Sequence, residues 1–327
     1  MRLRRSDPNG PGYRRRRRGR GFSFVDGEGR PITDPEQLDR MRSLAIPPAW
    51  RDVWVCPDPA GHIQATGIDA AGRKQYLYHP LWRAKRDEAK FDHVREVALR
   101  LPALRRRVAA DLRRRGLCRP RVLAAAVRLL DMGMFRVGCD EYATGDDPTF
   151  GVATLRPEHM RARRGGVVLT FPAKGGVELV RRVEDPYVCA VLRDLRRRRR
   201  AAERLFAYWE ERQWRDVHSD DINAYLRDAS GGPMTAKDFR TWHGTVLAAT
   251  RLAAVGVPSS AGRRKRAVAA VMREVAELLG NTPTVARNSY VDPRVVDLYH
   301  DGVTACIPRR SSRAAVERAV LDLLGDE

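Results

Sequence analysis

Five side chains stand in an order that suits chemistry on a phosphate ester: Arg136, Lys174, Arg240, Asn281 and Tyr290. A guanidinium presents a planar fork of donors that fits two phosphate oxygens, and a tyrosine hydroxyl can act as a nucleophile. Each residue alone is weak evidence, because the chain holds nine tyrosines and all but six of its 62 basic residues are arginine. Their order and the segments that surround them favour one shared site.

These residues lie in distinctive segments: FRVG at 135–138, KDFRTW at 237–242, GNTP at 280–283 and RNSY at 287–290. In these segments the chain resembles type IB DNA topoisomerases of the compact bacterial and poxvirus-like kind. The resemblance extends from IPPAW at 46–50 through KQYLY at 74–78 to residue 291, roughly three quarters of the chain. Members of that family use arginine, lysine, arginine, histidine or asparagine, and tyrosine in this order.

The resemblance implies a metal-free transesterification of one DNA strand. Tyr290 would attack the phosphorus, giving a 3′-phosphotyrosyl intermediate and a free 5′-hydroxyl. Arg136 and Arg240 would hold the non-bridging oxygens, where negative charge gathers in the transition state. Because a tyrosine phenol has a pKa of about 10, the cationic surroundings would also favour its ionised form.

Lys174 and Asn281 complete the predicted catalytic set. The departing 5′-oxygen needs a proton, and Lys174 in a Gly-flanked turn matches the general acid of the family; the alternative is a plain phosphate contact. Asn281 stands where poxviral and eukaryotic members have histidine, and its amide can donate a similar hydrogen bond to a phosphate oxygen. Ala286 is a further departure, at a place where some relatives have a small polar residue.

Five residues outside this set are predicted to bind DNA. Without the resemblance, Tyr76 and Tyr78 would be taken as sheet-core residues, because strand alternation places them on one face with Gln75 and Leu77 on the other. The resemblance directs this strand toward DNA and assigns a phosphate contact to Tyr142. The predicted DNA-binding residues are Gln75, Tyr76, Tyr78, Tyr142 and Lys237.

The elements that must position these residues fall into two groups. Short alternating runs predict strands at 22–25, 53–56, 62–67 and 73–78. A helical pattern follows over 81–115, interrupted at Pro102, and an apolar helix over 122–134. Strands at 167–171 and 177–183 precede helices at 186–208, 219–229, 236–255, 261–279 and 311–324.

We therefore predict an α+β protein with a small antiparallel β domain and a larger, mainly α-helical catalytic domain. The predicted parts are a disordered basic arm at 1–20, a β-rich DNA-binding domain at 21–95 and the helical domain at 96–327. The resemblance implies the catalytic core shared by tyrosine recombinases and type IB topoisomerases. It also implies a C-shaped clamp on duplex DNA that works as a monomer.

Charge and composition agree with a nucleic-acid partner. The formal net charge is +21, of which the first 20 residues carry +8, although a biased codon usage could also enrich arginine. We expect duplex DNA, preferentially supercoiled, with no obligate protein partner. Five scattered cysteines without a C-x-x-C pair favour a reducing, cytoplasmic and nucleoid-associated setting.

Several cofactors and settings are not expected. The chain has no phosphate-cradling glycine motif, so no ATP is expected, and the resemblance implies no need for a divalent metal. No apolar run is long enough to cross a membrane. Religation would need no ATP because one diester replaces another.

Two other functions fit parts of the pattern. A tyrosine recombinase shares the arginine, lysine, arginine and tyrosine centre, but it usually carries H-x-x-R at the second arginine and lacks the IPPAW and KQYLY segments. A catalytically silent DNA-binding protein would fit the charge, although no member of the catalytic set is missing.

Overall fold

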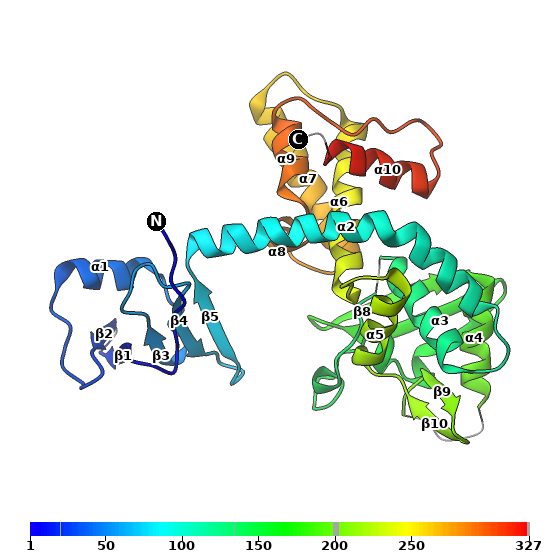
Figure 1. The fold of residues 1–327 in the computed structure, drawn as a ribbon, viewed down its shortest axis with the longest axis horizontal. Helices are drawn as coiled ribbons and strands as arrows, with labels where there is room; N and C mark the ends of the chain where they lie inside the picture. Colours follow the sequence, from blue (N-terminus) through cyan, green and yellow to red (C-terminus); the bar gives the residue numbers. More distant parts are fainter. Residues whose placement is uncertain (20, 134, 199–202, 326–327) are drawn as a thin grey trace. The chain divides into compact units, whose positions relative to one another are not determined.

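The computed structural model describes residues 1–19, 21–133, 135–198 and 203–325 (Figure 1). The chain divides into two compact units, Met1–Phe91 and Asp92–Glu327. The division falls four residues before the end of the predicted β domain at residue 95. It lies within the long helix α2, Pro80–Leu112.

The first unit is built on one five-stranded antiparallel sheet with the strand order β2-β1-β3-β4-β5. The four strands predicted from the sequence are all present, with bounds that differ by one or two residues. The strands are β1 Tyr13–Arg18, β2 Gly21–Val25, β3 Arg51–Val55, β4 Ile63–Ile68 and β5 Lys74–Tyr78.

The prediction of a disordered arm over residues 1–20 differs from this structure, because β1 lies inside that range. β1 pairs with β2 over its whole length and with β3 at Tyr13 and Arg14. The strand could not be predicted from the sequence, because a run of five arginines shows no alternation of apolar and polar residues. The backbone alternation places Arg15 toward the interior while Arg14 and Arg16 are exposed, so the charges do not prevent sheet formation.

One face of this sheet is covered by the helix α1, Pro35–Ser43. The side chain of Asp34 caps the helix by accepting from the Glu36 amide at 3.1 Å. Met41 is buried against Val53 and Val55 from the sheet, which forms the core of this unit. The IPPAW segment joins the same core through Ile46 and Trp50.

The second unit is mainly helical. Its helix α3, Arg119–Asp131, buries nine of its 13 residues, eight of them apolar, in the core of this unit. None of the described helices is long and apolar enough to cross a membrane. After α2, the helices are α3 Arg119–Asp131, α4 Pro186–Arg197, α5 Ser219–Ser230, α6 Ala236–Val255, α7 Ala261–Leu279, α8 Pro283–Tyr290, α9 Pro293–His300 and α10 Arg313–Leu323.

The second unit also contains two small antiparallel sheets. The strands β6 Met160–Arg163, β7 Gly166–Ala173 and β8 Val177–Val183 form one sheet in this order. The predicted strands at 167–171 and 177–183 correspond to β7 and β8. The strands β9 Ala207–Glu210 and β10 Gln213–Asp216 form a separate hairpin.

Two predicted features of the helical region are wrong. The helix α2 continues through Pro102, because Leu101 and Leu104 on either side of it are buried in the core and hold the helix together. The helix predicted to reach residue 208 ends at Arg197, and its last predicted residues belong to β9. The β9–β10 hairpin was missed because its turn has Glu211 and Arg212 at positive φ, whereas asparagine and glycine are the usual residues of such turns.

The last residue of the helix predicted at 122–134 lies outside the described residues.

A buried cluster of charges fixes the elements that carry the candidate site. Arg105 on α2 donates to Asp131 at the end of α3 and to Glu317 on α10. Burial alone would raise the pKa of Asp131, but its hydrogen bonds with Arg105 and the charge of Arg313 hold that pKa below its usual value. Burial lowers the pKa of His243 on α6 to about 4, so a neutral imidazole packs beside the cluster.

Candidate active site

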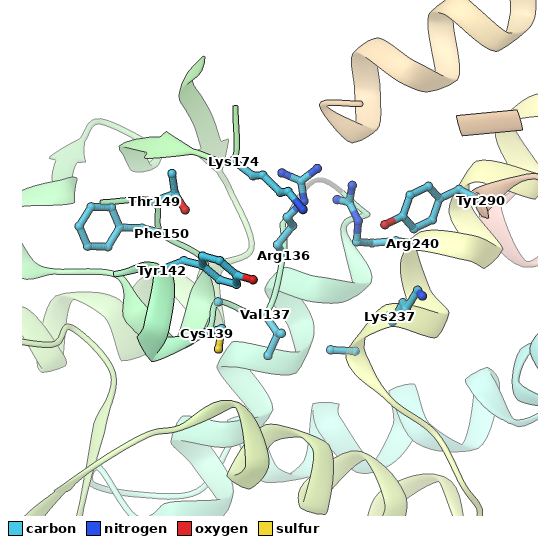
Figure 2. Close-up of a pocket in the computed structure, with 12 residues that line it drawn as sticks. Arg136, Val137, Cys139, Tyr142, Thr149, Phe150, Lys174, Lys237, Arg240 and Tyr290 are labelled. Carbon is cyan, nitrogen blue, oxygen red and sulfur yellow. The ribbon is translucent and has the colours of Figure 1, made fainter. Parts of the chain in front are cut away.

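The predicted catalytic residues converge on one pocket of the second unit. The pocket encloses about 500 Å³, and Figure 2 shows side chains from several elements directed into it. Four of the five predicted catalytic residues and two of the predicted DNA-binding residues line it. These six are Arg136, Lys174, Arg240, Tyr290, Tyr142 and Lys237.

Arg136 lies in the segment that follows α3, and a tight backbone crossing fixes this segment. The carbonyl of Arg136 accepts from the Val152 amide at 2.9 Å, and that of Val137 accepts from the Ala153 amide at 2.7 Å. Gly138 has a φ of +86°, and a Cβ there would lie 2.7 Å from Thr154 Oγ1. The glycine of the FRVG segment is therefore needed for this close approach.

Arg240 is the most buried of the charged groups in the pocket, with a relative exposure of 5%. It sits in the second turn of α6, whose first turn is held by Asp238 accepting from the Thr235 amide at 2.8 Å. Arg240 Nη2 donates to the Leu279 carbonyl at 2.5 Å. Its Nε is buried and has no hydrogen-bond partner in the described part of the chain.

The two arginines are close enough to influence each other. Burial lowers the pKa of the Arg240 guanidinium, and the charge of Arg136 lowers it further. Burial also lowers the pKa of Arg136. Because arginine stays protonated at any working pH, the pocket holds two partly desolvated positive charges. An anionic phosphate between them would offset their repulsion, as expected for a site that stabilises a phosphoryl transition state.

Asn281 does not line the pocket but holds one of its arginines. Its Oδ1 accepts from Arg136 Nη2 at 3.0 Å, and its Nδ2 donates to the Leu279 carbonyl at 3.3 Å. Arg136 also donates to the Gly280 carbonyl at 2.8 Å. The GNTP segment therefore anchors Arg136 at the C-terminal end of α7, where Gly280 caps the helix with a φ of +59°.

Tyr290 is the last residue of α8 and lies beside Arg240. Thr282 caps α8 by accepting from the Val285 amide at 3.3 Å, and Pro283 occupies its first turn. The Cζ of Arg240 lies 5.2 Å from the centroid of the Tyr290 ring. Figure 2 shows the Tyr290 hydroxyl directed toward the Arg240 guanidinium.

Lys174 stands at the tip of the β7–β8 hairpin. Gly175 and Gly176 follow it with φ angles of +93° and +73°, which only glycine adopts without strain. Lys174 is exposed, and in Figure 2 its side chain extends toward Arg136. The hairpin therefore brings a cation to the pocket from the side opposite Tyr290.

The predicted DNA-binding residues fall into two places. Tyr142 and Lys237 line the pocket and are exposed. Gln75, Tyr76 and Tyr78 lie on β5 in the first unit, and the predicted alternation is present. Tyr76 and Tyr78 are 43% and 42% exposed, with their rings stacked 6.1 Å apart. Gln75 points to the other face and donates to Asp69 at 2.9 Å.

Comparisons with known proteins agree with this geometry. Residues 79–305, more than half of the chain, match the family model "Eukaryotic DNA topoisomerase I, catalytic core". The chain belongs to the type IB DNA topoisomerase family. Residues 21–69 match the model "Bacterial DNA topoisomerase IB, N-terminal domain". The chain is 28% identical to the DNA topoisomerase 1B of Acanthamoeba polyphaga mimivirus over 278 residues, 81% of each protein.

Membership in this family makes the chain an isomerase that changes the topology of DNA. Both matched models describe topoisomerases, so nothing favours the recombinase alternative. The predicted α+β organisation is confirmed: an antiparallel sheet is followed by a helical catalytic core. Across the described ranges, no cluster of three or more His, Cys, Asp or Glu side chains could hold a metal ion.

Sequence reasoning missed the contacts that hold the backbone of Tyr290 in this topoisomerase. A Cβ on Gly244 of α6 would lie 2.5 Å from the Tyr290 carbonyl, so α8 approaches α6 as closely as a glycine permits. Thr245 Oγ1 donates to the same carbonyl at 3.5 Å and accepts from the Asp292 amide at 3.0 Å. The helix α6 therefore carries both Arg240 and the two residues, Gly244 and Thr245, that contact the Tyr290 carbonyl. The only sequence sign was a glycine inside a strong helical pattern.

The pocket contains further residues that no sequence pattern indicated. Cys139 and Thr149 line it from the segment between Arg136 and β6. Phe150 lies beside them, with its ring edge-on to His159 at 4.5 Å between centroids. Single cysteine, threonine and phenylalanine residues in a loop carry no recognisable spacing, so only the fold could reveal them.

Replacing Gly244 by alanine should separate Tyr290 from Arg240. The added methyl would force the carbonyl of Tyr290 away, and a shift of about 1 Å in a reacting group costs on the order of 10²-fold in rate. We expect Gly244→Ala to slow covalent DNA attachment by about 10–100-fold in single-turnover assays. Equilibrium binding of duplex DNA should change little.

Gly262→Ala provides the matched control. Gly262 lies in the first turn of α7, and the nearest atoms to a Cβ there are flexible side-chain ends at 3.8 Å. This change should leave the rate unaltered and stabilise the helix by about 0.5–1 kcal/mol. A Gly244→Ala enzyme as fast as the wild type would show that this contact does not set the position of Tyr290.

Proposed function

We propose that this topoisomerase cleaves one strand of duplex DNA with Tyr290 as its nucleophile. The phenolic oxygen attacks the phosphorus while the bond to the 5′-oxygen breaks. The products are a 3′-phosphotyrosyl ester and a 5′-hydroxyl, and the phenolic proton passes to water. The observation that supports this proposal is the placement of Tyr290, Arg136, Arg240 and Lys174 around one pocket.

Each remaining residue of the pocket has a role in this proposal. Arg136 and Arg240, which both line the pocket, bind the non-bridging oxygens. Lys174 gives its proton to the departing 5′-oxygen. Asn281 fixes Arg136, and rotation of its side chain would allow its amide to donate to the phosphate.

The topological change follows from the covalent intermediate. While the strand is open, the free 5′ end rotates about the intact strand and releases supercoils of either sign. Attack of the 5′-hydroxyl on the phosphotyrosine then restores the diester with no net loss of bond energy. We propose that the reaction needs neither ATP nor a divalent metal, because Arg136 and Arg240 supply the positive charge.

The proposed partner is supercoiled duplex DNA, and a cytoplasmic monomer without an obligate protein partner suffices for the reaction. Tyr142 and Lys237 extend the pocket with groups that can contact neighbouring phosphates. Closure of the two units around a duplex is part of this proposal.

A plasmid relaxation assay tests the proposal. In EDTA and without nucleotide, the protein should convert both negatively and positively supercoiled plasmid into closed, relaxed topoisomers. Nicked circles without closed relaxed products would indicate a nuclease. A requirement for ATP or Mg²⁺ would contradict the proposed chemistry. Products joined between two plasmids that carry paired sites would instead indicate a recombinase.

A further inference from the structure

The five consecutive arginines of β1 are divided by the strand into two sets with different surroundings. Arg15 faces the interior and donates to the carbonyls of Ile46, Pro47 and Trp50 at 3.0, 3.1 and 2.7 Å. Its guanidinium also stacks over the Phe22 ring at 4.1 Å. Arg15 is therefore a structural residue that binds the IPPAW segment to the sheet.

The alternate residues Arg14, Arg16 and Arg18, which we call the arginine stripe, face the other way. All three are exposed. Within the described ranges, none of them has a hydrogen bond or an ion pair with an acidic side chain. By contrast, Arg30 in the turn after β2 pairs with Asp26 and Glu28. Three unneutralised charges on one strand repel each other, so the isolated protein gains no stability from placing them together.

The sheet register places the stripe on the same face as the exposed tyrosines of β5. Arg14 is opposite Trp54, Trp54 is opposite Thr66, and Thr66 is opposite Tyr76. Directly paired residues on neighbouring strands project to the same face, so Arg14 and Tyr76 share one. This is the face away from α1, and β1 and β5 lie on it three strands apart, about 14 Å.

The N-terminal segment covers the middle of this face. Trp54 is buried there, and its Nε1 donates to the Gly10 carbonyl at 3.3 Å. The Arg4 amide donates to Ala60 and its carbonyl accepts from His62, which fixes the segment next to β4. The exposed groups of this face are therefore two separate rows, the arginine stripe on β1 and Lys74, Tyr76 and Tyr78 on β5.

We propose that the arginine stripe binds the phosphate backbone of the duplex DNA on which the enzyme acts. This inference rests on the proposed function. Side chains two residues apart on a strand are about 6.5–7 Å apart, so the three long arginine side chains can reach successive phosphates of one DNA strand. The stripe lies just before the residues that match the N-terminal domain model, 21–69, and β1 pairs within the same sheet.

The expected effect is on salt dependence and affinity, with no effect on the chemical step. Each neutralised phosphate contributes about −0.9 to the slope of log K against log salt. Loss of three contacts should therefore reduce the steepness of that slope by about 2.7. Because phosphate contacts carry no sequence information, affinity should fall equally for duplexes of different sequence.

The triple variant Arg14→Gln, Arg16→Gln, Arg18→Gln tests the stripe. Binding to a duplex oligonucleotide is measured between 50 and 200 mM salt by fluorescence anisotropy, with full-length protein. The matched control is Arg30→Gln, Arg42→Gln, Arg251→Gln, which removes the same charge from exposed arginines that pair with acidic side chains. The stripe variant should lose about 2.7 from the slope, and the control should keep the wild-type slope to within about one unit.

The outcomes separate the stripe from the proposed function. If the stripe variant keeps the wild-type slope, or the control loses as much, the stripe does not bind DNA. If the wild-type protein neither binds duplex DNA nor relaxes plasmid, the proposed function itself fails. The double variant Arg14→Gln, Arg16→Gln, expected to lose about 1.8, provides a second test should the triple variant fold poorly. At saturating DNA, the stripe variant should attach covalently at the wild-type rate.

Discussion

Replacing Tyr290 by phenylalanine should abolish relaxation and covalent attachment while duplex binding stays within about twofold of the wild type. The phenyl ring fills the same space beside Arg240, 5.2 Å from its Cζ, so the pocket should keep its shape. Only the proposed attacking oxygen is lost, and among the described residues the other tyrosine that lines the pocket is Tyr142. The measurement is trapping on a suicide substrate, in which the cleaved end diffuses away and the protein–DNA adduct accumulates on a denaturing gel.

Tyr142→Phe is the matched control for this experiment, because Tyr142 lines the same pocket and is 49% exposed. It should still form the adduct, with any loss appearing in DNA binding. Peptide mapping of the wild-type adduct should locate the DNA on the segment that ends at residue 290. An adduct in the Tyr290→Phe protein, or one that maps to residue 142, would overturn the assignment of the nucleophile.

The convergence of Arg136, Arg240 and Tyr290 on one pocket could be predicted from the sequence, because the segments around them resemble those of the topoisomerase family. Their catalytic roles stay a prediction that rests on the chemistry of guanidinium groups and a phenol at a phosphate. The bounds of α6 and α7 were predicted without error because each shows a clear helical period that ends at a glycine, Gly256 or Gly280.

The parts that could not be predicted depend on contacts between distant segments. β1 has no hydrophobic period, and it forms because β2 and β3 pair with its backbone and Arg15 reaches three carbonyls. α2 passes through Pro102 because packing on both sides outweighs one lost hydrogen bond. The close approach at Gly244 depends on where α8 lies, which no local pattern describes.

Which charged side chains are available to a ligand also depends on contacts between distant segments. Sequence composition predicts a polyanion as the partner, but it cannot tell which arginines are available to bind it. In the structure, Arg105 forms ion pairs with Asp131 and Glu317, and Arg15 donates hydrogen bonds to three backbone carbonyls. Arg136 and Arg240 donate to backbone carbonyls and Asn281, and among the described residues neither forms an ion pair with a carboxylate, which leaves their charges uncompensated. Uncompensated positive charge inside a pocket is what a phosphodiester requires.

Replacing Lys174 by alanine should slow cleavage of ordinary DNA by about 10²–10⁴, the usual contribution of a general acid. A substrate with sulfur in place of the bridging 5′-oxygen should recover most of this loss, because a thiolate leaves without being protonated. Single-turnover rates on the two substrates, each measured with wild-type protein and variant, give the comparison.

Lys237→Ala distinguishes an acid from a phosphate contact, because Lys237 is the other exposed lysine that lines the pocket. A lysine that only binds phosphate stabilises cleavage of both substrates equally, so sulfur should not rescue its loss. The hairpin places Lys174 across the pocket from Tyr290, the side from which an in-line leaving group departs. If the Lys174→Ala protein were equally slow on both substrates, Lys174 would be a phosphate ligand, and the proton would have to come from another group of the pocket.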